Sequence, residues 1–220
     1  MCKKTATTVE HAPPKCLFPE KNDLPPGVIL RKNLITVPSC DEHNSQKQKD
    51  DEYLRLCLLM NIANNDTAFT LFSSKVSRAM ERNPELFKHL TRERVPVVAV
   101  DKETGEAINT LMVKVDSARL LKSLEHIARA IFFHQCGNRF EGRCVILYDF
   151  GLYHGRGDDA KWNDFIQITC QQMKDYFDPK AHAGDNPEVF KYFLENVDKG
   201  FILKMQFYGG GNVFAAFVPQ

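Results

Sequence analysis

Three short stretches near the N-terminus carry the residue types that could do chemistry. Glu10 and His11 form an adjacent acid–imidazole pair, and Asn33 stands ahead of an apolar run. Residues 40–44 read Cys-Asp-Glu-His-Asn. Carboxylate and amide oxygens bind hard divalent ions, and a neutral imidazole accepts a proton near pH 7. Together, these residues indicate a small metal-dependent site that hydrolyses a phosphodiester.

The same residues, in this order, resemble the HNH motif of the ββα-metal (His-Me finger) endonucleases over about the first 55 residues. The resemblance implies that His11 is the general base, at the end of a first strand, and that Asn33 shapes the loop that orients it. It also implies that Glu10 and Asn44 bind one catalytic divalent ion, usually Mg²⁺. Family members often have Asp where this chain has Glu10, and many have His where it has Asn44.

Family members often stiffen this module with a zinc ion held by two Cys-x-x-Cys pairs. Cys40 and His43 match the second pair with one His replacement, whereas Cys2 has no partner cysteine before it. Cys16 is either a substitute ligand or an ordinary loop or core cysteine. The resemblance thus implies a structural zinc at Cys2, Cys40 and His43 that lacks a fourth protein ligand. The alternative is a module without zinc that is stabilised by packing against the rest of the chain.

Up to residue 40 we expect only short strands and turns around these residues, and from residue 41 we expect a helix. Repeated prolines in this stretch exclude a long helix. Residues 28–30 and 34–37 are predicted as two strands joined by a turn at 31–33, and acidic residues mark a helix start at Asp41. Such a hairpin buries little by itself. We expect a ββα-metal module over residues 1–56.

Residues 57–220 are predicted to form a second, mixed domain, so the fold class expected for the chain is α+β. The stripe of apolar residues over 117–135, followed by Gly137, is the clearest helix signal. Residues 208–212, Tyr-Gly-Gly-Gly-Asn, predict a hairpin turn. The remaining predicted elements are helices over 52–62, 69–80, 84–90, 162–176 and 188–195, and strands over 95–101, 109–115, 143–148, 201–207 and 213–218.

Composition limits the class of partner. The net charge is only +1, so no global positive field favours coating of nucleic acid, although a local grip on one phosphate needs no such field. We predict that Lys15, Lys32 and Lys47 contact a nucleic-acid substrate, with DNA as the expected one. Seven cysteines in mostly apolar segments indicate reduced thiols. With no signal-like N-terminus and no apolar run of about 20 residues, we expect a cytoplasmic protein without a membrane partner.

Each motif residue also has a simpler explanation. Asn33 is a typical turn residue, Glu10 and His11 could lie in a solvated loop, and residues 40–43 could be a helix cap and first turn. The main alternative function is therefore a non-catalytic, zinc-stabilised module that binds nucleic acid or protein. A further alternative is that the C-terminal domain carries the function through a protein partner.

Outside the motif, candidate sites are weaker. Residues 154–159, His-Gly-Arg-Gly-Asp-Asp, lack a Walker pattern and are better explained as a solvent loop. Nothing in the sequence fixes Cys136 next to His134 as a thiol–imidazole pair.

Overall fold

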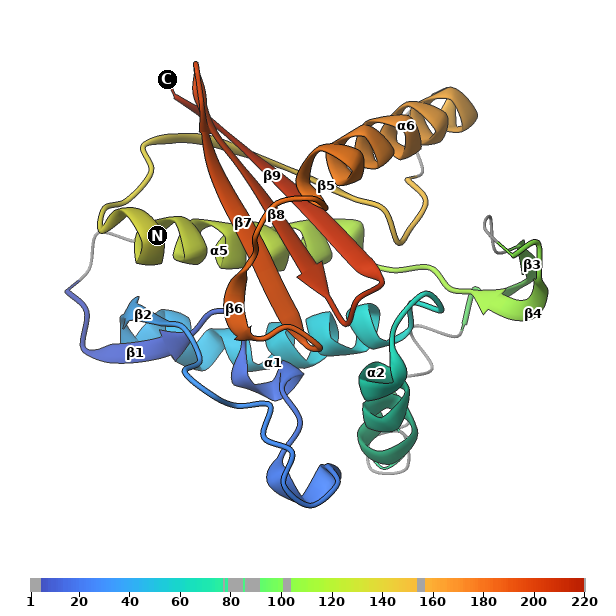
Figure 1. Ribbon diagram of the computed structural model, residues 1–220, viewed down its shortest axis with the longest axis horizontal. Coiled ribbons are helices and arrows are strands. Elements are labelled where there is room, and N and C mark those ends of the chain that lie inside the picture. The colour runs from blue at the N-terminus through green and yellow to red at the C-terminus, as the bar shows by residue number, and fades with distance from the viewer. Residues whose placement is uncertain are drawn as a thin grey trace.

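The C-terminal third of the chain forms an antiparallel sheet on which the helices pack (Figure 1). In this computed structural model the described residues are 5–219, except 77, 79–84, 86–91, 101–103 and 154–156, and for 41–46 and 75 only the backbone is described. The helices are α1 (Asp41–Leu59), α2 (Asp66–Leu71), α5 (Ser117–Cys136) and α6 (Asp159–Phe177), with short 3-10 turns at Lys15–Leu17 and Lys21–Asp23 and a π-helical turn at Phe72–Val76. The strands are β1 (Thr8–His11), β2 (Thr36–Ser39), β3 (Val95–Val100), β4 (Ala107–Met112), β5 (Gly142–Tyr148), β6 (Ala183–Asn186), β7 (Phe190–Val197), β8 (Gly200–Phe207) and β9 (Gly211–Pro219).

The main sheet has the strand order β5-β9-β8-β7-β6, with every pair antiparallel. Helices cover both of its faces. Successive side chains of a strand point to opposite sides, so each strand can contribute side chains to the packing on both faces. Phe217 on one face lies 5.1 Å, ring to ring, from Phe132 of α5. Phe193 on the other face lies 5.2 Å from Phe177 at the end of α6. The core is thus one layer of strands between α5, joined by α1, and α6. The α+β class expected from the sequence is confirmed.

The N-terminal segment belongs to the same packed structure. Strands β1 and β2 pair antiparallel, with Glu10 opposite Val37 and His11 opposite Thr36, and α1 follows directly. Val37 packs with Ala12 against Ala130 of α5. The boundary expected at 56/57 falls inside α1, and buried side chains from both sides of it share one cluster. Tyr208, fully buried between β8 and β9, donates its hydroxyl to the Leu17 carbonyl at 2.6 Å.

Two of the predicted elements are wrong in type. Residues 28–30 form no strand: they follow Pro25-Pro26-Gly27, and Ile29 is more than half exposed. The strand that pairs with β2 is β1, which the sequence pattern did not identify. Residues 188–195, predicted as a helix, lie mostly in β7, where Phe190 and Tyr192 are buried at a period of two. Period-two burial is the mark of a strand.

Most other predicted elements are confirmed within a few residues. These include the helix start at Asp41, the helices over 117–135 and 162–176, the strands over 95–101, 109–115, 143–148, 201–207 and 213–218, and the turn at 208–212. The separate helix expected over 52–62 is wrong, because residues 52–59 continue the helix that begins at Asp41. The helix expected over 69–80 is α2 followed by the π-helical turn as far as Val76, and its remainder lies largely outside the described residues. Most of the helix expected over 84–90 also lies outside them. Within the described ranges, no helix combines the length and apolar character that a bilayer span requires.

Candidate functional site

Glu10 is the point where β1, β2 and α1 meet. Ser39 of β2 donates its hydroxyl to Oε2 of Glu10 at 3.1 Å, and Lys47 of α1 donates its ammonium to Oε1 at 3.1 Å. Only 17% of the Glu10 side chain and 11% of the Lys47 side chain are exposed. An ion pair this sheltered is screened little by salt. Glu10 is therefore not a solvated loop residue, and Lys47, predicted as a substrate contact, is directed at Glu10.

Asp51 lies one turn beyond Lys47 on α1 and completes an acidic–basic cluster with Glu10. Burial raises the pKa of Asp51 to about 6; Lys47 opposes the shift, whereas Glu10 and Asp50 add to it. Its Oδ1 atom is buried without a hydrogen-bond partner. Asp51 follows Lys47 by four residues, the spacing that places two side chains on one helix face, and this spacing is the sequence signal that points to the pair.

His11 is the last residue of β1, where the resemblance places the general base. Its Nδ1 atom is buried and has no hydrogen-bond partner. Burial lowers the pKa of His11, and the positive charges of Lys15 and Arg31 lower it further, while the Ile35 backbone acts in the opposite direction. The neutral imidazole is thus favoured at pH 7, which is the protonation state that a general base requires.

The structure holds Asn33 away from this cluster. Asn33 adopts a positive φ of 41° in the turn before β2, and its Nδ2 donates to Oδ2 of Asp185 in β6 at 2.6 Å. Beside it, the Lys32 amide donates to Oδ1 of Asn186 at 3.1 Å, and Nδ2 of Asn186 donates to the Lys32 carbonyl at 2.7 Å. Asn33 is thus a turn residue that fastens the loop to β6. Asp185 and Asn186 were not anticipated from the sequence.

The other basic residues near His11 are exposed or half-buried. Lys15 and Lys32 are exposed, as a substrate contact requires. Arg31 donates two hydrogen bonds to the Phe18 carbonyl, at 3.1 and 2.8 Å, and pairs with Glu20 at 3.3 Å. Lys15 and Arg31 are close enough to His11 to disfavour its protonated form.

His126 of α5 is exposed and lies within electrostatic range of Lys47 and Glu10. Partial desolvation lowers its pKa, and so do the positive charges of Lys47 and Lys122, while Glu10 opposes them. Helix α5 packs against α1 and β2, which brings His126 into this range.

The predicted zinc ligands cannot be assembled from the described side chains. Cys2 lies outside the described residues, and His43 is described only as backbone in the first turn of α1. Cys40 is buried at the start of that helix and forms no disulfide with a described cysteine. The possible substitute Cys16 donates its thiol to the Asp51 carbonyl, and burial raises its pKa to about 11, which opposes the thiolate that zinc needs. Among the described residues, no group of three His, Cys, Asp or Glu side chains is placed to hold a metal.

A catalytic Mg²⁺ makes smaller demands on the protein. It usually keeps several waters and uses one or two carboxylates. The Glu10 carboxylate fits such a site chemically, and Asn44, described as backbone, lies three residues before Lys47 on α1. Oε1 of Glu10 is bonded to Lys47. An ion bound at Glu10 would compete with that ammonium for the carboxylate.

Comparison with protein-family models, with curated proteins and with solved structures gave no match. The HNH resemblance therefore depends on the motif residues of the sequence.

Proposed function

We propose that this protein is a metal-dependent endonuclease that hydrolyses phosphodiester bonds, with DNA as its substrate, by one-metal HNH chemistry. The observation that supports this function best is the order β1–β2–α1. In it His11 ends the first strand, and the preceding Glu10 contacts α1 through Lys47. The resemblance requires this order, and the sequence pattern had placed the first strand elsewhere.

In this proposal His11 takes the proton from the attacking water, because its buried imidazole is neutral at pH 7. A divalent ion would be held by Glu10 and Asn44, and when bound it would supply the positive charge that stabilises the phosphoryl oxygens. Lys15 and Lys32, exposed on the loop between β1 and β2, would bind flanking phosphates and fix the position of the strand. Asn33 supports the reaction by holding this loop against β6.

The proposal includes a reducing compartment, the cytoplasm. Among the six cysteines that the structure describes there is no disulfide, and three of them are buried. Reduced, buried cysteines are typical of proteins in such a compartment.

Nicking of supercoiled plasmid by the purified full chain, in Mg²⁺, Mn²⁺ or EDTA, tests this function. We expect metal-dependent nicking that falls by roughly 10²- to 10⁴-fold in His11→Ala, the usual contribution of a general base. His134→Ala is the matched control, because His134 is an exposed histidine on α5. Equal nicking by His11→Ala and the parent would exclude the proposed base.

One observation favours a second candidate, a non-catalytic nucleic-acid-binding module. The Lys47 ammonium occupies the carboxylate that the reaction needs for its metal. If Lys47 is a permanent replacement for that ion, the protein would bind DNA equally well in Mg²⁺ and in EDTA and would not cut it. Gel-shift and nicking assays on the same preparation separate the two candidates.

A further inference from the structure

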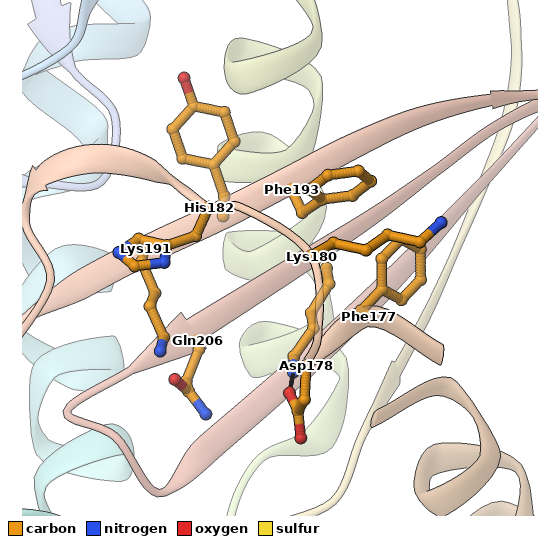
Figure 2. Close-up of a pocket in the computed structure, with 9 residues that line it drawn as sticks. Phe177, Asp178, Lys180, His182, Lys191, Phe193 and Gln206 are labelled. Atoms are coloured by element: carbon orange, nitrogen blue, oxygen red, sulfur yellow. Dashed lines mark hydrogen bonds and ion pairs between the residues drawn. The ribbon is translucent and has the colours of Figure 1, made fainter. Parts of the chain in front are cut away.

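A second site lies on the sheet face that α6 leaves partly open. Helix α6 contacts β5 and β9, at one side of that face. Over β7 and β8 the same face carries Lys191 opposite Gln206 and Phe193 opposite Lys204. These side chains, with Asp178 and His182 from the connection between α6 and β6, line a pocket (Figure 2).

The lining is rich in positive charge: three lysines and a histidine face one aspartate. Two of the lysines are already paired. Lys204, only 6% exposed, forms an ion pair with Asp178. Lys180 pairs with Glu195 at 2.7 Å and lies over the Tyr176 ring at 3.6 Å. Figure 2 shows its ammonium reaching past Phe177, away from Lys191.

Lys191 is the lysine that remains uncompensated. Within the described part of the chain it has no carboxylate partner, and neither has His182. In Figure 2 the Lys191 ammonium points toward the Gln206 side chain, and the His182 ring lies near the start of the Lys191 side chain. Gln206 is held in place because its amide donates to Oδ1 of Asn212 at 3.1 Å. The pocket therefore presents an ammonium, an imidazole N–H and the remaining donors of Lys204 to a common space.

We propose that this pocket binds the phosphate group of a ligand. Its volume of about 40 Å³ is room for about three waters, which is enough to admit one oxyanion. A phosphate offers several acceptor oxygens, so it can accept from Lys191, His182 and Lys204 at once, and lysine is a common phosphate ligand. The negative charge would also compensate Lys191. None of the lining residues belongs to β1, β2 or α1, so binding here does not depend on the proposed nuclease activity.

The phosphate could belong to a free phosphorylated molecule or to a nucleic-acid strand. Strand β6 connects the pocket with the candidate nuclease site. It follows His182 directly, and its residues are hydrogen-bonded to Lys32 and Asn33 of the loop between β1 and β2. A strand bound along Lys15 and Lys32 would have a continuation toward Lys191. The test below separates the two sources.

Isothermal titration calorimetry in EDTA tests the site. The probes are inorganic phosphate, a 5′-mononucleotide, and a single-stranded oligonucleotide without a terminal phosphate. The variant is Lys191→Gln, which removes the uncompensated charge from a residue without an ion pair, so the fold is expected to persist and is checked by circular dichroism. Lys199→Gln, at an exposed lysine in the turn between β7 and β8, is the matched control.

We expect at least one probe to bind the parent and Lys199→Gln equally and to bind Lys191→Gln about tenfold more weakly, the loss expected for a charge-assisted hydrogen bond. If the small phosphates show this loss, the ligand is a free phosphate compound. If the oligonucleotide alone shows it, the ligand is a phosphodiester of a nucleic acid. The proposal is overturned if no probe binds, or if no binding depends on Lys191. Since His11 is not involved, His11→Ala should bind as the parent does, even if the nuclease proposal fails.

Discussion

The ammonium of Lys47 lies 3.1 Å from Oε1 of Glu10, and both side chains are largely covered. This contact joins α1 to β1 through the one carboxylate that the proposed reaction needs. In the absence of an ion, Lys47 neutralises Glu10. A metal ion at Glu10 would compete with Lys47 for this carboxylate.

Replacing Lys47 with Met should destabilise the protein in EDTA by about 2 kcal/mol, because Glu10 is left as a sheltered charge without its cation. Excess Mg²⁺ should restore much of the loss, since a ligand that binds only the folded state stabilises it. Urea denaturation with and without Mg²⁺ measures both effects. Lys49→Met, at an exposed lysine of the same helix, should show neither. If Mg²⁺ stabilises Lys47→Met no more than the parent, Glu10 is not a metal ligand.

Asp51→Asn should be more stable than the parent at neutral pH. The pKa of Asp51 is about 6 in the folded protein and about 3.8 in the unfolded chain. A raised folded pKa contributes stability at low pH that is lost as pH rises from about 4 to about 6. The variant should therefore match the parent near pH 4 and exceed it near pH 8 by on the order of 1 to 2 kcal/mol.

Urea denaturation across that pH range, in EDTA, checks this expectation. Asp164→Asn is the control, because Asp164 is exposed on α6. A difference between Asp51→Asn and the parent that does not change with pH would contradict the raised pKa.

Asn186→Ala should loosen the loop that carries Lys32. The Asn186 side chain is 4% exposed and exchanges two hydrogen bonds with the Lys32 backbone. Their loss should cost about 2 kcal/mol and speed hydrogen exchange at the Lys32 amide. Asn33→Gly, which keeps the positive φ and removes only an exposed bond to Asp185, should cost less than about 1 kcal/mol. Unchanged exchange at Lys32 in Asn186→Ala would show that the loop does not depend on β6.

Gly210→Ala should be among the most damaging single substitutions in the β8–β9 turn. A Cβ at Gly210 would lie 2.1 Å from the Ala63 carbonyl oxygen, which is backbone and cannot move aside cheaply. We expect a loss of about 3 kcal/mol, measured by thermal unfolding. Gly105→Ala is the control: it too places Ala in a turn, at a φ of 73°, but with open space around its Cβ, and should cost about 1 kcal/mol. Equal losses of stability in the two variants would mean that residues 61–65 move away from the new Cβ at little cost.

Sequence alone determined the elements whose signals are local. The apolar stripe of α5 repeats at the helical period, Asp116 caps its start and Gly137 ends it with a φ of 73°, so each signal agrees with the next. The β8–β9 hairpin has a glycine-rich turn between two apolar runs. In both cases the decisive contacts lie within a few residues of one another along the chain. The α+β class could be predicted from such local signals.

Tertiary structure decided what depends on distant partners. Residues 188–195 contain apolar residues that fit either period, and pairing with β8 selected the strand. Glu10 faces Lys47 because β1 pairs with β2 across a long loop, and Asn186 reaches Lys32 from far along the chain. Non-local pairs of this kind leave no periodic mark on the sequence, since they are fixed by packing of the whole fold and not by local backbone preference. The motif residues could thus be picked out from the sequence, but their partners could not.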